Sequence, residues 1–180
     1  MPKALRTAFI ENYYRFATPD DLPATQAARE TLAQSHLEWG NRRKAGEILV
    51  RAFNPSAVTP GFGAVHTVIE TVVDDSPFIV DSLAMRLNAL SQGVLVTLHS
   101  VMHVERDGRG KLRACHALQS DDGDTRGVPE SWTHFEIPRV LDADELRQLE
   151  RQLSATLEDV ARAVHDWPHM LRLLRTKVGS

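Results

Sequence analysis

The stretch Ala64–Gly93, AVHTVIETVVDDSPFIVDSLAMRLNALSQG, decides the fold that we predict for this chain of 180 residues. β-Branched residues dominate from Val65 to Val73, and both of the alternating sets contain apolar members. Such a pattern suits a central strand better than a free edge of a sheet. The turn Asp74–Pro77 follows directly and marks the change from strand to helix.

A helix is predicted to begin at Pro77, because the N–H that proline lacks would have no partner at the first helical position. Asp75 or Ser76 can accept a hydrogen bond from the first-turn amides. Apolar residues then recur at steps of four and three and give the helix one face for burial, namely Ile79, Leu83, Leu87 and Leu90. Gly93 is expected to end the helix in a left-handed conformation.

Two helical segments are predicted ahead of this stretch. Residues 5–16 carry an apolar and aromatic stripe, Thr18–Asp21 has the residues of a helix start, and residues 25–43 form a second helical segment. This segment ends in the basic run Arg42–Lys44, which we interpret as a solvated helix C-terminus that the helix macrodipole favours. Phosphate binding by this run is the alternative.

The remaining segments are predicted to be strands joined by turns, followed by a long helix. The loop Thr59–Gly63 precedes the central strand, and Asp107–Gly110 forms the turn of a hairpin. The further strands are expected at residues 48–54, 94–106, 111–118 and 132–140, with an exposed loop at 119–131. Asp142 should cap the last helix, whose apolar stripe reaches Trp167, and Pro168 should end or kink it.

This order of elements predicts an α+β fold. Antiparallel strands with two helices on one face form a two-layer sandwich, preceded here by an N-terminal helical pair. We expect a helical segment at residues 1–46, the α+β domain at residues 47–167, and a tail at residues 168–180 that leads to a further domain. The apolar residues Met170 to Leu174 of this tail have nothing left in the chain to bury them.

Composition and charge exclude several classes of protein. The formal net charge is −3, and acidic and basic residues are mixed along the chain, so we expect no nucleic-acid partner. Cys115 is the single cysteine, which excludes an internal disulfide and fits a reducing cytoplasmic compartment. No stretch approaches the ~20 apolar residues that cross a bilayer, so we expect no membrane partner.

Histidine is the residue type that offers a metal site. None of the 10 glycines builds a dinucleotide turn or a phosphate loop. Five histidines fall on predicted strands, namely His66, His99, His103, His116 and His134. His99 and His103 share one face of their strand, and a neighbouring strand could add a third ligand. We favour a structural place on a sheet face or interface for these histidines, and metal binding is the alternative.

The carboxylates Asp74, Asp75 and Asp81 surround the turn and could serve acid–base chemistry or bind a cation. Capping of the helix N-terminus explains them better. Ser76 and Ser82 lack a motif that identifies an adjacent base, and Cys115 lies within a strand rather than at a helix N-terminus. We therefore assign no catalytic residue.

Several motifs resemble one family. The arrangement of strand, Asp-x-Pro turn, amphipathic helix and hairpin resembles the ACT domain, a ferredoxin-like βαββαβ module. The motifs that extend the likeness are Asn12-Tyr13-Tyr14-Arg15, Phe53-Asn54-Pro55, His66-Thr-Val-Ile-Glu-Thr-Val-Val-Asp-Asp-Ser-Pro-Phe-Ile-Val-Asp-Ser82 and Val164-His-Asp-Trp-Pro-His-Met170. They are similar to the N-terminal region of the large bacterial NAD-specific glutamate dehydrogenases.

The resemblance implies a non-catalytic domain that acts in assembly or allosteric control. Its partners would be the rest of the parent chain and its other subunits in a homo-oligomer, and NAD would bind elsewhere in the parent, so we expect no cofactor in this chain. ACT domains commonly bind an amino acid where a glycine follows the turn proline, and Phe78 occupies this position here. Two alternatives stay open: an amino-acid sensor that binds its effector through Asp75, Ser76, Pro77 and Phe78 at the Asp75–Ser82 turn, and a small His-dependent metalloenzyme.

Overall fold

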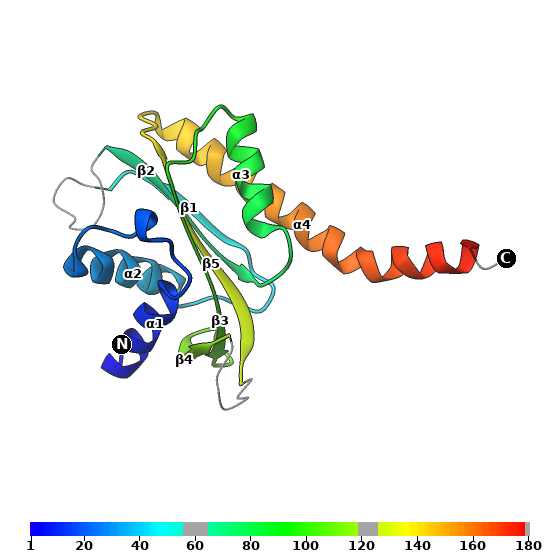
Figure 1. Ribbon diagram of the computed structural model, residues 1–180, viewed down its shortest axis with the longest axis horizontal. Helices are drawn as coiled ribbons and strands as arrows, with labels where there is room; N and C mark the ends of the chain where they lie inside the picture. Colours follow the sequence, from blue (N-terminus) through cyan, green and yellow to red (C-terminus); the bar gives the residue numbers. More distant parts are fainter. Residues whose placement is uncertain (56–64, 119–125, 179–180) are drawn as a thin grey trace.

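The protein folds around a five-stranded antiparallel sheet with helices on both of its faces (Figure 1). The computed structural model describes residues 1–55, 65–118 and 126–178, with side chains described as far as residue 166. The strand order across the sheet is β1-β2-β5-β3-β4. In chain order the elements are α1 (Lys3–Tyr13), the 3-10 turn η1 (Pro19–Asp21), α2 (Gln26–Gly40), β1 (Leu49–Phe53), β2 (His66–Asp74), α3 (Ile79–Ala89), β3 (Val96–Arg106), β4 (Leu112–Ala117), β5 (Val128–Pro138) and α4 (Ala143–Val178).

The topology confirms the predicted α+β class. β2 and β3 both pair antiparallel with β5, so they run parallel to each other with β5 between them, and α3 makes the crossover. This is the split βαβ arrangement of ferredoxin-like folds. β2 also pairs with β1, which confirms its predicted place inside the sheet.

Alternation along β2 explains why both of its residue sets are apolar. Val68 and Val72 face α1 and α2, whereas Ile69 and Val73 face α3 and α4. All four side chains are at most 5% exposed. A strand covered by helices on both faces has no polar face, which is why no clean apolar–polar alternation appears in this segment.

The N-terminal helical pair covers the face of the sheet opposite to α3 and α4 (Figure 1). Phe9 of α1 packs edge-on against Trp132 of β5, with ring centroids 4.8 Å apart. Gly40 lets the end of α2 approach the same ring, because a Cβ at this position would lie 2.5 Å from Trp132. The helical pair therefore shares a core with the sheet and adds a third layer to the predicted two.

Two predictions about α3 are wrong at its ends. The helix begins at Ile79 rather than Pro77, because β2 continues to Asp74 and Phe78 then turns the chain in a left-handed conformation with φ of 72°. At the other end the left-handed residue is Ser91, with φ of 59°, and not Gly93. A hydrogen bond from Gln92 N–H to the Leu87 carbonyl, 2.9 Å long, closes this end in the manner of a Schellman motif.

The boundaries of two other elements also differ from prediction. Thr18–Asp21 forms only a 3-10 turn, and Thr25 caps α2 by accepting a hydrogen bond from Ala28 N–H at 3.1 Å. β5 begins at Val128, inside the stretch predicted to be a loop, and Glu130 and Ser131 are fully buried. The polar character of these residues suggested a loop, but in the folded chain partners on other elements satisfy them.

The last helix extends further than predicted. Asp142 Oδ1 accepts hydrogen bonds from Asp144 and Glu145 N–H, which confirms the predicted cap. α4 continues past Pro168 to Val178, so Pro168 does not end the helix, and Figure 1 shows its C-terminal part projecting away from the sheet. The loop Thr59–Gly63, residues 119–125 and the side chains of the predicted tail lie outside the described residues.

Candidate functional site

The turn that the sequence singled out lies where β2 passes into α3. Asp75 N–H donates to the Pro129 carbonyl at 3.0 Å, which extends the pairing of β2 with β5 by one bond. Asp75 and Ser76 are half-buried, whereas Pro77 and Phe78 are exposed. The turn thus presents one aromatic ring to solvent beside a partly shielded carboxylate.

Phe78 adopts a conformation that favours glycine. Its φ of 72° and ψ of 6° fall in the left-handed region, which costs a residue with a Cβ roughly 1–2 kcal/mol. Its ring is 69% exposed, so little burial offsets this cost. The Phe78 carbonyl accepts the first helical hydrogen bond, from Ser82 N–H at 2.9 Å. Within the described residues no side chain caps α3, so the predicted capping by Asp75 or Ser76 is wrong, because Phe78 takes the N-cap position. Strained non-glycine residues of this kind concentrate at functional sites.

Arg43 forms hydrogen bonds and an ion pair at the start of the turn. It lies past the end of α2, in the basic run that we interpreted as solvated, yet it is only 2% exposed, so this interpretation is wrong for Arg43. Its guanidinium donates to Asp74 Oδ1 at 2.6 Å, to Glu130 Oε1 at 2.7 Å and to the Glu47 carbonyl at 2.7 Å. These bonds tie the end of β2 to the start of β5.

Arg106 completes a cluster around the buried Glu130. It donates to both carboxylate oxygens of Glu130, at 2.7 and 2.8 Å, and to the Gly110 carbonyl at 2.9 Å. Gly110 has φ of +78°, and a Cβ there would meet the Arg43 carbonyl oxygen at 2.5 Å. We call Arg43, Arg106, Glu130 and Asp74 the arginine cluster. Two arginines and two carboxylates make it neutral overall.

Two cavities border the turn. One of about 730 Å³ lies between the arginine cluster, the β3–β4 hairpin and the start of β5, with Asp74 and Asp75 in its wall. The other, of about 130 Å³, lies between Ser76, Ile79 and the α4 residues Leu157 and Val160. The larger cavity is within the size range of small-molecule sites.

The carboxyl of Asp75 has an electrostatic partner on β3. Burial raises the pKa of Asp75, and the nearby His99 acts in the opposite direction. For the base His99, burial instead lowers the pKa. Its Nε2 lies 2.9 Å from Ser131 Oγ. Burial thus acts against the charged form of both groups at this edge of the site.

The structure places the predicted histidines on strands but does not gather them into a metal site. Among residues 1–55, 65–118 and 126–166, no group of three metal-ligating side chains comes together, with His99 and His103 included. His103 instead lies opposite His116 in the β3–β4 ladder. Burial raises the pKa of the Cys115 thiol to about 12, so this cysteine is poorly suited to act as a nucleophile.

A second buried set of ionisable groups lies further along the same face of the sheet. Tyr13, His36, Glu70, His134 and Glu136 follow one another from α1 through α2 and β2 to β5, and we call them the buried ionisable chain. Successive members lie 2.8, 3.8, 3.1 and 3.6 Å apart at their nearest polar atoms. Sequence reasoning missed this set, although Tyr13 and His36 stand at the helical spacing of the buried Phe9 and Leu32, a signal that could have identified them.

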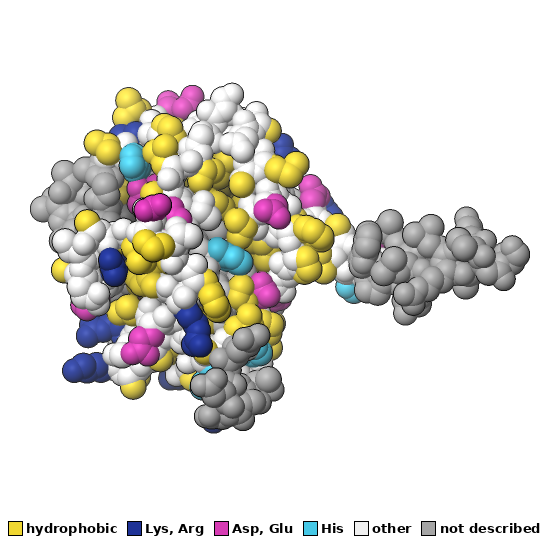
Figure 2. Space-filling view, viewed as in Figure 1, with side chains coloured by type: hydrophobic (Ala, Val, Ile, Leu, Met, Phe, Trp, Pro, Cys, Tyr) yellow, Lys and Arg dark blue, Asp and Glu magenta, His cyan; other side chains and the backbone are white. Residues whose placement is uncertain are grey.

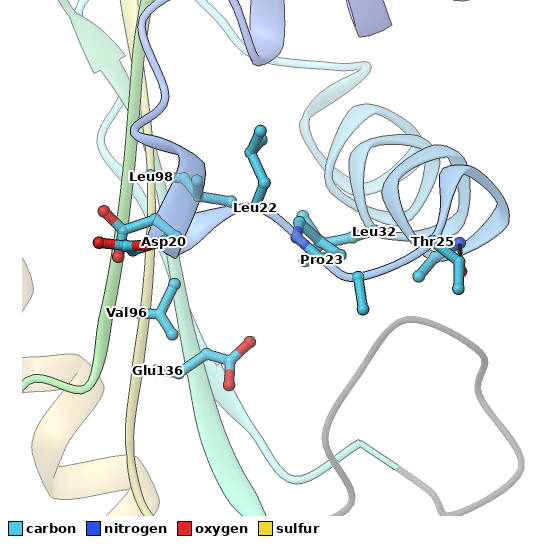
Figure 3. A pocket seen from close by; sticks show the side chains of 11 residues that line it. Asp20, Leu22, Pro23, Thr25, Leu32, Val96, Leu98 and Glu136 are labelled. Carbon is cyan, nitrogen blue, oxygen red and sulfur yellow. Dashed lines mark hydrogen bonds between the residues drawn. The ribbon is translucent and has the colours of Figure 1, made fainter.

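Glu136, the last member of the buried ionisable chain, lies at a third cavity of about 380 Å³ between the start of α2 and the sheet (Figure 3). Leu32, Val96 and Leu98 line this cavity, and the Glu136 carboxylate extends from β5 toward the side of the cavity that α2 forms.

On the face of the molecule seen in Figure 2, acidic and basic side chains are scattered and form no block of one sign. In the part of the chain that is described, no helix combines the length and apolarity required to span a membrane.

The fold and these residues define an ACT-like α+β domain. A family model described as the glutamate dehydrogenase ACT1 domain matches residues 9–153, and the chain belongs to this family. No solved structure gives a significant match.

Similar full-length proteins are far longer than this chain. The NAD-specific glutamate dehydrogenase of Pseudomonas aeruginosa is 30% identical over 167 residues, which cover 91% of this chain and 10% of that protein. The enzyme of the same name from Mycobacterium tuberculosis is 26% identical over 193 residues, covering 100% of this chain and 11% of that protein. The chain thus spans about a tenth of the length of the curated relatives that it matches.

Proposed function

We propose that this chain is a non-catalytic regulatory or assembly domain of an NAD-dependent glutamate dehydrogenase, which oxidatively deaminates L-glutamate to 2-oxoglutarate and ammonia. The family match over residues 9–153 supports this parentage. The much greater length of the relatives supports a role within a larger enzyme. In this proposal the partners of the domain are the rest of the parent chain and its other subunits.

The described residues do not fit an NAD site of the dinucleotide-fold type. Such a site requires parallel neighbouring strands and a glycine-rich turn at a helix N-terminus. The described strands pair antiparallel, and the turn before α3 reads Asp-Asp-Ser-Pro-Phe. We therefore propose that NAD binds to other parts of the parent enzyme.

One observation carries the assembly role, namely the exposed and left-handed Phe78. Its ring is 69% exposed at a position whose backbone favours glycine. A strained, exposed aromatic residue is costly in an isolated domain, but in an assembly its ring can be buried against a neighbouring subunit, where aromatic residues contribute strongly. The arginine cluster holds Asp74, which stands four residues before Phe78.

The non-catalytic part of the proposal is tested by a spectrophotometric assay. The purified chain, mixed with L-glutamate and NAD, should give no increase in NADH absorbance above a blank without protein. Measurable reduction of NAD that depends on the chain would contradict the proposal.

A second candidate function is sensing of an amino acid at the Asp75–Ser82 turn. The observation that favours it is the cavity of about 730 Å³ with Asp74 and Asp75 in its wall. Asp75 offers a carboxylate to an ammonium group, because no arginine of the cluster is bonded to it in the described hydrogen bonds. Phe78, in the place of the glycine found in ligand-binding ACT domains, opposes this candidate by crowding the backbone.

Calorimetric titration separates the two candidates. Glutamate, aspartate and the branched-chain amino acids would be titrated into the wild-type chain and into Ser76→Trp, which places a bulky ring at the turn. The assembly role predicts no saturable heat with any of them. Saturable heat in the wild type that Ser76→Trp abolishes would instead establish sensing at the turn.

A further inference from the structure

The buried ionisable chain crosses the interface between the N-terminal helical pair and the sheet. Tyr13 is 2% exposed, and His36, Glu70 and His134 are fully buried. The Tyr13 hydroxyl lies 2.8 Å from His36 Nδ1, and Glu70 Oε1 lies 3.8 Å from the same nitrogen. The polar contacts between α1, α2 and β2 at this point therefore meet at one ring nitrogen of His36.

The carboxylates near His36 already have basic partners when this histidine is neutral. Glu70 accepts from Arg51 Nε of β1 at 2.7 Å and lies 3.1 Å from His134 Nδ1 of β5. His134 also forms an ion pair with Glu136, which His66 of β2 contacts at 2.6 Å. A proton on His36 would add a positive charge to a buried site whose carboxylates already have cationic partners, which costs free energy.

A proton on Nδ1 of His36 would reverse its hydrogen bond with Tyr13, because a protonated Nδ1 can only donate. The Tyr13 hydroxyl can donate to Nδ1 when His36 is neutral with its proton on Nε2. Burial raises the pKa of Tyr13 well above its ordinary value, so the hydroxyl keeps its proton. A protonated Nδ1 cannot accept this bond. The neighbouring Tyr14, also on α1, donates instead to the Arg29 carbonyl at 2.9 Å and takes no part.

We propose that His36 is a proton-sensitive latch, which holds α1 and α2 on the sheet while it is neutral and loosens them when it is protonated. The titratable and charged groups that face it are Tyr13 from α1, Arg51 from β1, Glu70 from β2 and His134 from β5. The latch is a property of the 180-residue chain itself and does not depend on the role of the turn in the parent enzyme.

The pKa shifts agree in sign with a latch that opens in acid. Burial lowers the pKa of His36 from 6.5 to about 4, against the attraction of Glu70. The unfolded or detached state therefore binds more protons than the docked state between pH 6.5 and about 4, and docking weakens as the pH falls through this range. His134 has the opposite sign: burial acts to lower its pKa, but Glu136 and Glu70 outweigh it and raise the pKa. Protonation of His134 thus favours the docked state.

Protons can reach the buried ionisable chain through Glu136, its last member. The side chain of His66 is 31% exposed, and Glu136 lies in the wall of the cavity beside the start of α2 (Figure 3). Glu136 and His134 then connect this cavity to Glu70, next to His36. The site is buried, but it is not isolated from solvent.

Amide hydrogen exchange between pH 7 and pH 5 tests the latch in the wild-type chain, after correction for the intrinsic exchange rates. The amides of α1 and α2 should lose protection about tenfold or more over this range, because one proton taken up below pH 6.5 changes an equilibrium up to tenfold per pH unit. The amides of the β2–β5 ladder should keep their protection from exchange. Equal protection of α1 and α2 at both pH values would overturn the proposal.

Two matched variants separate the latch from general acid instability. Tyr13→Phe removes the hydroxyl that favours neutral His36, so the midpoint for loosening of α1 and α2 should rise by about one pH unit. Tyr14→Phe makes the same change beside it and should leave the midpoint unchanged. An NMR titration of the His36 ring should show the same shift in its pKa. Equal midpoints in Tyr13→Phe and the wild type would overturn the proposal.

Discussion

Two buried charge clusters lie on the same face of the sheet, and they differ in the chemistry of their cations. The arginine cluster surrounds Glu130, near the start of β5, with Arg43 and Arg106. In the buried ionisable chain, Glu70 lies beside His134 and His36 and pairs with Arg51 of β1. Both carboxylates are fully buried, so the difference lies in their partners.

The difference between arginine and histidine partners shows that burial alone does not make a charged group sensitive to pH. Arginine stays protonated under all physiological conditions, so the arginine cluster has one charge state and holds the turn at Asp74 in one position. Histidine changes its charge near neutral pH, so the ionisable chain has more than one state. The fold thus combines a permanent anchor for the turn with a titratable attachment of the helical pair.

The largest effect is expected from Glu130→Gln, which leaves the guanidinium of Arg106 without a carboxylate and that of Arg43 with Asp74 alone. We predict a loss of about 3–5 kcal/mol in the free energy of unfolding, measured by urea denaturation. The loss should be the same at pH 6 and at pH 9, because arginine does not titrate there. A loss that changed by more than about 1 kcal/mol over this range would contradict the comparison.

The same substitution in the second cluster, Glu70→Gln, should cost about 2–3 kcal/mol at pH 6, because Arg51 is partly exposed and retains some hydration. Its cost should decrease toward pH 9. The raised pKa of His134 in the folded state gives stability that is complete below pH 6.5 and is lost as the pH rises through the raised value, and Glu70 is one source of this shift. Urea denaturation at pH 6 and pH 9 measures both costs, and a constant value would remove the distinction between the clusters.

The smallest loss in the free energy of unfolding is expected for an exposed ion pair. Asp159 and Arg162 pair on α4 with side chains 66% and 68% exposed. Asp159→Asn should change the free energy of unfolding by less than about 0.5 kcal/mol, because water competes for both groups. A loss close to that of Glu70→Gln would mean that burial is not the source of the larger effects.

The order of strands and helices could be predicted from the sequence because apolar periodicity is local. The alternation in residues 65–73 and the stripes of α1, α3 and α4 follow from neighbours in the chain, and so does the hairpin turn at Asp107–Gly110. The resemblance to a family extended this to the ACT-like fold. The two ends of α3, at Phe78 and Ser91, depart from the residue preferences, because each residue takes a backbone conformation that glycine usually supplies.

The charge clusters could not be predicted, because their partners are far apart in the sequence. Arg43 and Glu130 are 87 residues apart, and neither shows by local pattern that it is buried. The polar character of Glu130 predicts a loop, and the basic run around Arg43 predicts a solvated helix end. A carboxylate and a guanidinium each mark a surface until the fold brings them together.

The central claim is that the turn above the arginine cluster presents Phe78 as an assembly contact in the parent enzyme. Sedimentation velocity of a parent glutamate dehydrogenase that carries Phe78→Gly tests it most directly. Ser91→Gly is the matched control, because it relieves the other left-handed non-glycine residue among the described ones without removing an exposed ring. We predict that Phe78→Gly raises the subunit dissociation constant at least about tenfold while Ser91→Gly leaves it unchanged. Wild-type assembly in both variants would contradict the claim.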